Sequence, residues 1–154
     1  MGAEAWGFWV LVAGWASAVF WFDATTARIP NWLTLPAIVV TWGACALLWL
    51  GWIDFWGPVN SPVAIWGGVL WWGAIVIGGV AFPRHAAVAA DAKLAAVLGV
   101  FAAGLQGVLG VLLCWLIAGL LGVCTGVLWG RRTEVPQGPA MILAVTLVAV
   151  WSAL

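Results

Sequence analysis

Long apolar segments alternate with short polar ones along almost the whole chain. A helix rises about 1.5 Å per residue, so a segment of about 20 apolar residues can cross the hydrocarbon of a bilayer. On this scale the pattern predicts six transmembrane helices, at about residues 5–22, 32–53, 61–82, 86–103, 108–129 and 139–154. We therefore expect an all-α fold, a polytopic membrane helix bundle formed by a single domain, residues 1–154.

Polar residues indicate where the first three helices begin and end. Asp23 follows the first apolar segment, and Pro30 prevents that helix from simply continuing. Asn31 is suited to be the N-cap of the second helix. Ser61 and Pro62 have the pattern of an N-cap and a first-turn proline, which predicts the start of the third helix.

The break between the fourth and fifth helices is the weakest in the sequence. Residues 86–129 are almost continuously apolar and too many for one crossing. The clearest interruption within them is Ala-Ala-Gly-Leu-Gln-Gly at residues 102–107, which contains two glycines and a glutamine. We expect a tight turn near Gly104 to Gly107, because glycines accept backbone conformations that other residues avoid.

Composition supports an integral membrane protein and excludes several other classes. The chain is 66% hydrophobic and 6% charged, with a formal net charge of zero, unlike an ordinary soluble domain. The absence of a basic cluster argues against nucleic-acid binding. Glu4 makes the N-terminus acidic, so the first apolar segment is expected to be retained rather than removed as a signal peptide.

All five basic residues fall in the polar segments that six crossings would bring to one side of the membrane. These residues are Arg28, Arg84, Lys93, Arg131 and Arg132. The positive-inside rule therefore predicts that this side is cytoplasmic and that both termini are outside. An even number of crossings separates Asp23 from Asp91, so both carboxylates are expected at the cytoplasmic edge.

Two carboxylates that meet at a membrane edge have a possible chemistry of their own. They can share one proton, because two close negative charges are unfavourable. One carboxylate can then act as a base on water while the other protonates or polarises a peptide carbonyl, as in an aspartic protease. The spacing equally allows a structural role, in which each aspartate ends a helix at the interface and Asp91 interacts favourably with a helix N-terminus.

Three segments resemble motifs of the type IV prepilin leader peptidases. Asp23 with Arg28-Ile29-Pro30-Asn31 and Leu33-Thr34 is similar to the first catalytic loop of that family. Ala90-Asp91-Ala92-Lys93-Leu94 is similar to the second motif, Gly-x-Gly-Asp-x-Lys-Leu, and residues 135–140 resemble the Pro-Phe-Gly-Pro stretch that opens the last helix. The short chain, without an amino-terminal cysteine-bearing cytoplasmic domain, resembles the small peptidases of Flp/Tad pilus systems.

The resemblance implies a multi-pass aspartic endopeptidase of the bacterial inner membrane. Asp23 and Asp91 would form the catalytic dyad that removes the leader of a prepilin at the cytoplasmic face, after a glycine in the typical substrate. Residues of the same motifs that would support substrate binding are Arg28, Pro30, Asn31 and Lys93. The expected partners are the prepilin and membrane lipid. The domain missing here accompanies N-methylation in larger relatives, so no methyltransferase activity is expected.

The chain departs from the family at both motif glycines, which are replaced by Val88 and Ala90. A degenerate copy with the same fold and little catalysis is therefore one alternative. A second is a non-enzymatic protein, such as a pilus assembly subunit or a small transporter, in which the aspartates relay protons or anchor loops. An intramembrane protease of another Gly-x-Gly-Asp type is less consistent with the Arg-Ile-Pro-Asn loop. The sequence does not indicate the oligomeric state.

No cofactor or metal is expected. The three cysteines, Cys45, Cys114 and Cys124, lie within apolar segments and have no CxxC spacing, so neither a zinc site nor a redox pair is indicated.

Overall fold

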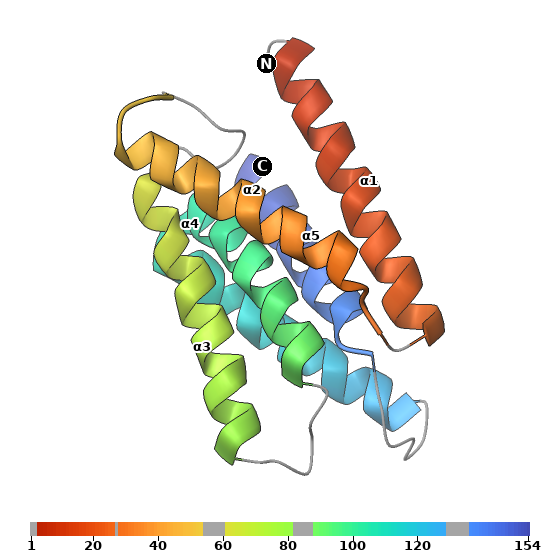
Figure 1. Ribbon diagram of the computed structural model, residues 1–154. Helices are drawn as coiled ribbons and strands as arrows, with labels where there is room; N and C mark the ends of the chain where they lie inside the picture. Colours follow the sequence, from red (N-terminus) through yellow and green to blue (C-terminus); the bar gives the residue numbers. More distant parts are fainter. Residues whose placement is uncertain (1–2, 27, 54–60, 82–87, 129–135) are drawn as a thin grey trace.

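The computed structural model describes residues 3–26, 28–53, 61–81, 88–128 and 136–154, and the regular elements in these ranges are all helical. They are α1 (Ala3–Thr26), α2 (Asn31–Trp49), the short 3₁₀ helix η1 (Pro62–Ala64), α3 (Ile65–Ala81), α4 (Val88–Leu128) and α5 (Gly138–Ala153) (Figure 1). The predicted all-α fold is confirmed.

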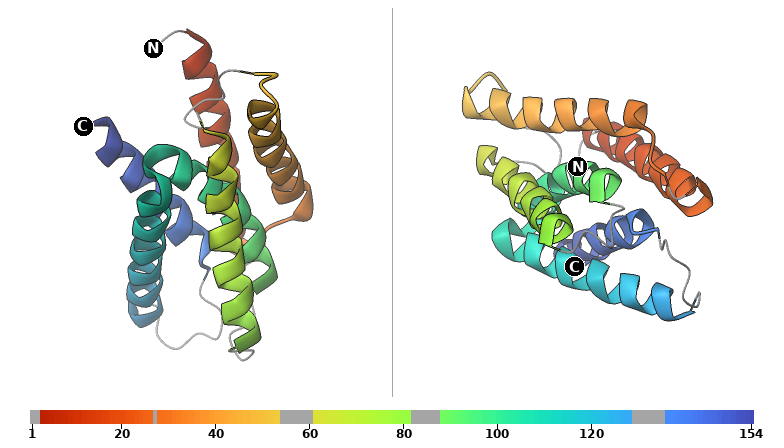
Figure 2. Two further views of the ribbon diagram at one scale, coloured as in Figure 1. Left: turned by 90° about the vertical axis from the view of Figure 1, so that its left-hand side faces the viewer. Right: turned by 60° about the horizontal axis from the view of Figure 1, so that its bottom comes forward.

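Helix α4 is two helices joined by a sharp reversal. Gln106 (φ −141°, ψ 19°) and Gly107 (φ 62°, ψ −147°) leave the helical conformation inside it. Residues 88–105, the first arm, therefore run in one direction, and residues 108–128, the second arm, return beside them (Figure 2). The turn predicted near Gly104 to Gly107 is confirmed.

The helical segments alternate in direction, so their ends gather at two ends of the bundle. Both chain termini lie at the upper end in Figure 1 and in the left view of Figure 2. Helix α1 ends and α4 begins at the opposite end, which we call the carboxylate end because it contains Asp23 and Asp91. The bundle thus brings two aspartates from distant parts of the sequence to the same end.

The first arm of α4 is the centre of the bundle. Leu94, Ala95, Val100 and Ala102 are fully buried in it, and α3, α5 and α2 pack around it. Helix α3 comes especially close, because Gly99 of α4 lies against the backbone of Gly67 and leaves no room for a Cβ atom on either residue. This close approach holds α3 to the arm that carries Asp91.

The outer surface of the bundle is apolar, as expected of a protein that contacts lipid. Exposed large hydrophobic side chains include Val10, Leu11, Val39, Ile77 and Val127, each at least 66% exposed. Three helical segments are long and apolar enough to cross a membrane: Gly7–Thr26, Asn31–Trp49 and Ala89–Val127. Two shorter apolar helices, Ile65–Ala81 and Gly138–Ser152, complete the bundle.

Several predicted helix boundaries were wrong. Helix α1 does not stop at Asp23 but continues to Thr26, and the hydroxyls of Thr25 and Thr26 bond back to the carbonyls of Trp21 and Phe22 at 2.7 Å each. Helix α2 ends at Trp49 rather than near residue 53. The third segment begins with η1 instead of an α-helical turn.

Candidate active site

Asp23 lies on the last turn of α1 and points into the bundle. Its side chain is only 4% exposed. Its Oδ2 atom accepts a hydrogen bond of 2.8 Å from the backbone N–H of Gly138, the first residue of α5. The first N–H groups of a helix have no partner within it, so Asp23 satisfies a donor that would otherwise be unpaired.

Gly138 is needed for this contact because of its missing side chain. A Cβ atom there would lie 2.6 Å from Asp23 Oδ2 and 3.2 Å from its Cγ. Pro139 follows in the first turn of α5, where a proline costs no helical hydrogen bond. The Gln-Gly-Pro sequence therefore opens α5 directly against the Asp23 carboxylate.

Asp91 lies in the first turn of α4 and is partly buried. Its carboxylate is close enough to that of Asp23 for their charges to interact. The structure thus brings together the two aspartates that the sequence singled out, from α1 and from the first arm of α4. Asp91 also benefits from its position near a helix N-terminus, where negative charge is favoured.

The connection between α1 and α2 is held beside the two aspartates by a buried anchor and a polar contact. Ile29 is 7% exposed and belongs to the core, and the Pro30 carbonyl accepts the N–H of Leu33 at 3.1 Å. The Nζ atom of Lys93 donates to Oδ1 of Asn31 at 2.7 Å. This contact ties the start of α2 to α4, two residues beyond Asp91.

Asn31 was predicted as the N-cap of the second helix, and this was wrong. The N-cap is Pro30, in an extended conformation (φ −63°, ψ 140°), and no side chain caps the helix. The asparagine was misassigned because its oxygen accepts from Lys93, a residue 62 positions away, rather than from its own helix.

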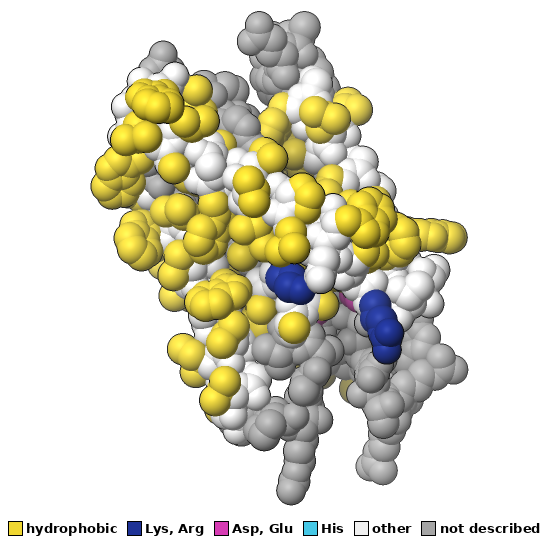
Figure 3. Space-filling model, viewed as in Figure 1, with side chains coloured by type: hydrophobic (Ala, Val, Ile, Leu, Met, Phe, Trp, Pro, Cys, Tyr) yellow, Lys and Arg dark blue, Asp and Glu magenta, His cyan; other side chains and the backbone are white. Residues whose placement is uncertain are grey.

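The other predicted supporting residues are placed less centrally. The Arg28 side chain is exposed, and its backbone carbonyl accepts the Thr26 hydroxyl at 3.0 Å. In the view of Figure 3 the basic side chains lie in the lower half of a mainly hydrophobic face. Arg84, Arg131 and Arg132, which carry much of the topology prediction, lie outside the described residues.

The two replaced motif glycines, Val88 and Ala90, lie in the first turn of α4. Their backbone is helical, a conformation that any residue other than proline adopts readily. Glycine is therefore not required at either position by the backbone.

Sequence reasoning missed one buried polar residue of the first motif. Thr34 is fully buried, and its Oγ1 atom has no hydrogen-bond partner. Its helix neighbours are apolar, so the only signal in the sequence was its place in the Leu33-Thr34 pair.

Among the described residues, no group of three or more His, Cys, Asp or Glu side chains is arranged to hold a metal ion. Comparison of the chain with protein-family models, with curated proteins and with solved structures finds no match.

Proposed function

We propose that the protein is a membrane aspartic endopeptidase that removes the leader of a type IV or Flp prepilin, using Asp23 and Asp91. The observation that carries the proposal is that two carboxylates, one buried and one partly buried, lie within range of charge–charge interaction at one end of an apolar bundle. Burying a carboxylate is costly, so two of them within range of each other favour a chemical role over a purely structural one.

The two aspartates would work with one proton between them. Asp23, held by the Gly138 N–H and facing the N-terminus of α5, is suited to remain the carboxylate and to take a proton from the attacking water. Asp91 would hold the shared proton and donate it toward the scissile carbonyl as the tetrahedral intermediate forms. The peptide bond then breaks with proton transfer to the leaving amine, and the dyad returns to its starting state.

The proposal includes six membrane crossings, by α1, α2, α3, the two arms of α4, and α5. Helix α3 has 17 residues and α5 has 16, close to the lower limit of about 17 for a span. The carboxylate end would face the cytoplasm of a bacterial inner membrane, as the distribution of basic residues in the sequence favours. The prepilin leader would reach the dyad from that side.

One observation favours a second function for Asp23, that of a structural anchor. Its bond to Gly138 caps α5 across 115 residues of sequence, and this contact alone could explain why the carboxylate is buried. A non-enzymatic or degenerate membrane protein of the same fold would retain it.

Asp→Asn substitutions separate the two functions. At position 23, asparagine keeps a side-chain oxygen that can accept the Gly138 N–H, but it has no carboxyl group that can take up or release the proton needed for catalysis. Each variant is co-expressed with an Flp-type prepilin, and processing is followed by the size of the pilin. Asp23→Asn and Asp91→Asn should each lower cleavage by roughly 10⁴-fold, and the double variant should be scarcely worse than either. All three should accumulate in the membrane like the unaltered protein.

Asp54→Asn is the matched control, since Asp54 lies between the second and third predicted spans, away from both motifs. It should process the prepilin normally. Substantial cleavage by Asp23→Asn or Asp91→Asn would overturn the dyad. If Asp23→Ala no longer accumulated in the membrane, while Asp23→Asn accumulated and cleaved the prepilin normally, Asp23 would be a structural anchor and not a catalytic residue.

A further inference from the structure

Thr34 is a polar residue of α2 that is fully buried and whose hydroxyl has no partner. Its side chain is 0% exposed, and its Oγ1 atom forms no hydrogen bond within the described part of the chain. Burial removes the hydroxyl from water without replacing the lost hydrogen bonds, and for this reason buried polar groups nearly always have a partner. The hydroxyl therefore either weakens the fold or forms a hydrogen bond in the working protein.

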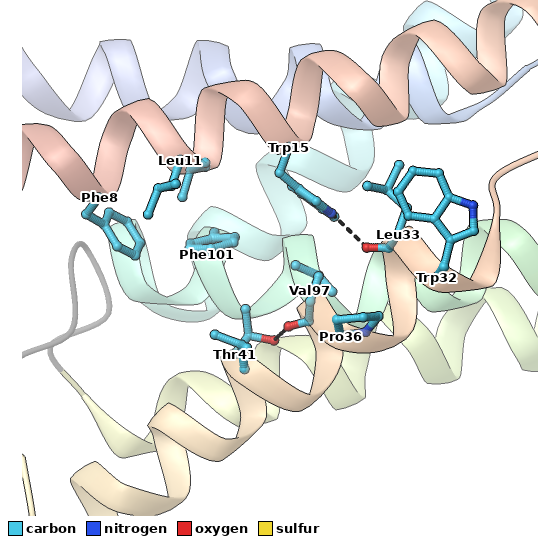
Figure 4. Close-up of a pocket in the computed structure, with 12 residues that line it drawn as sticks. Phe8, Leu11, Trp15, Trp32, Leu33, Pro36, Thr41, Val97 and Phe101 are labelled. Atoms are coloured by element: carbon cyan, nitrogen blue, oxygen red, sulfur yellow. Dashed lines mark hydrogen bonds between the residues drawn. The ribbon is translucent and has the colours of Figure 1, made fainter.

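The other threonines that the structure describes all bond back to their own helix, as Figure 4 shows for Thr41. The residues whose hydroxyl donates to the carbonyl four positions earlier, at 2.7–2.9 Å, are Thr25, Thr26, Thr41, Thr125 and Thr146. The equivalent carbonyl for Thr34 is that of Pro30, which already accepts the N–H groups of Leu33 at 3.1 Å and of Thr34 at 3.4 Å. The hydroxyl of Thr34 is therefore left for a partner outside its own helix.

Contacts on either side of Thr34 place it beside the first turns of α4. Helix α2 and the first arm of α4 run in the same direction from the carboxylate end (Figure 1). One turn before Thr34, Asn31 accepts a hydrogen bond from Lys93. One turn after it, Ile38 packs against the core cluster that contains Val97. Residues three and four apart share a helix face, so the buried Thr34 lies between these two levels of the first arm.

Asp91 is a polar side chain on the same turns of α4 and has a carboxyl that is not held in place. It is partly buried, and it interacts with the charge of Asp23, but no group in the described part of the chain donates a hydrogen bond to it. Asp23, in contrast, is held by the N–H of Gly138 at 2.8 Å. Lys93 is already bonded to Asn31. The unheld carboxyl is therefore the partner that these turns offer to a buried hydroxyl.

We propose that Thr34 is a positioning residue of the dyad and that its hydroxyl hydrogen-bonds the carboxyl of Asp91. Rotation of the Asp91 side chain toward α2 forms this bond and removes the cost of the buried hydroxyl. A threonine hydroxyl suits both protonation states, since it donates to a carboxylate and accepts from a carboxylic acid. Each aspartate then has one fixed contact, Asp23 from the N-terminus of α5 and Asp91 from α2. The bond holds the Asp91 carboxyl in one orientation while its proton moves toward the scissile carbonyl.

This inference rests on the proposed peptidase function, and its first test is kinetic. Thr34→Val keeps the size of the side chain and removes the hydroxyl, whereas Thr34→Ser keeps the hydroxyl. With a purified Flp-type prepilin as substrate, Thr34→Val should lower kcat about tenfold with little change in KM, the equivalent of one lost hydrogen bond. Thr34→Ser should stay close to the unaltered protein.

Thr41→Val is the matched control. Thr41 is also buried on α2, at 4% exposure and two turns beyond Thr34, but its hydroxyl already donates to the Ala37 carbonyl at 2.8 Å. It should leave kcat and KM unchanged. An unchanged kcat in Thr34→Val, together with a higher unfolding temperature, would overturn the inference, because it would show a hydroxyl that never finds a partner. An equal loss of kcat in Thr34→Ser and Thr34→Val would also overturn it, since packing and not the hydroxyl would then matter.

Infrared spectroscopy tests the bond itself without any substrate. The C=O stretch of the protonated Asp91 carboxyl is assigned as the band that disappears in Asp91→Asn. The inference predicts that this band moves to higher frequency in Thr34→Val, because a hydrogen bond to the carboxyl is lost, and stays in place in Thr41→Val. A band at the same frequency in Thr34→Val would overturn the inference. If the unaltered protein cuts no prepilin, the proposed function fails, and the position of this band still decides whether Thr34 bonds to Asp91.

Discussion

Gly138 is the residue on which the position of Asp23 most depends. Its N–H donates to Asp23 Oδ2 at 2.8 Å, and the absence of a Cβ atom is what permits this approach. Because Asp23 is buried, its carboxylate has little free space in which to avoid an added methyl group.

Gly138→Ala should therefore impair catalysis more than folding. The new Cβ atom would lie 2.6 Å from Oδ2, so the carboxylate must turn away from its bonded position. A displacement of about 1 Å in a catalytic group can cost on the order of 100-fold in rate. We expect a loss of this size in kcat for prepilin cleavage, measured on purified protein.

The control is Gly119→Ala on the second arm of α4, where a Cβ atom meets nothing within 4 Å. It should leave cleavage unchanged. Normal activity in Gly138→Ala would mean that the geometry of Asp23 does not matter to the reaction.

The sequence predicted both aspartates but not the contacts that hold them. Asp23 and Asp91 stand in recognisable motifs, and the count of crossings placed them at one end. The bonds from Gly138 to Asp23 and from Lys93 to Asn31 join residues 115 and 62 positions apart, and no local pattern encodes such pairs. The orphaned hydroxyl of Thr34 is equally a product of tertiary packing.

At the scale of the elements, the reversal inside α4 decides the topology. Without it, Asp91 and the N-terminus of α5 would not return to the same end of the bundle. The sequence predicted this turn from its glycines, and Gly107 explains why, since its φ of 62° and ψ of −147° are nearly exclusive to glycine. The helix ends were predicted less well, because Asp23 is buried against Gly138 instead of ending α1 in water, and α1 continues to Thr26.

Gly107→Ala should destabilise the protein by about 1–3 kcal/mol through backbone strain alone. No atom lies within 4 Å of the added Cβ, so a steric clash does not contribute. Thermal unfolding in detergent measures the effect. Gly14→Ala, in open space on α1, is the comparison and should be neutral or slightly stabilising. Equal stability of the two variants would show that the reversal does not need glycine.

At the scale of the whole molecule, four charged residues lie at the carboxylate end: Asp23, Arg28, Asp91 and Lys93. Elsewhere, the described part of the surface exposes many large apolar side chains. This asymmetry is compatible with six crossings and with one water-exposed end at which the proposed reaction takes place.

Cysteine accessibility tests the orientation that the proposal requires. In a background with Cys45, Cys114 and Cys124 replaced by alanine, Thr25→Cys should react with a membrane-impermeant thiol reagent only from the cytoplasmic side. Trp52→Cys, 74% exposed near the other end, should react only from outside. If both positions were labelled from the same side, α2, which lies between them, would not cross the membrane.

Cleavage by the purified protein alone tests the central claim most directly. The protein is reconstituted in liposomes with a purified Flp-type prepilin, and the products are identified by intact mass. The account predicts that the unaltered protein releases the leader without any added cofactor, and that the double variant Asp23→Asn, Asp91→Asn releases none. Leader release by the double variant, or none by the unaltered protein, would contradict it.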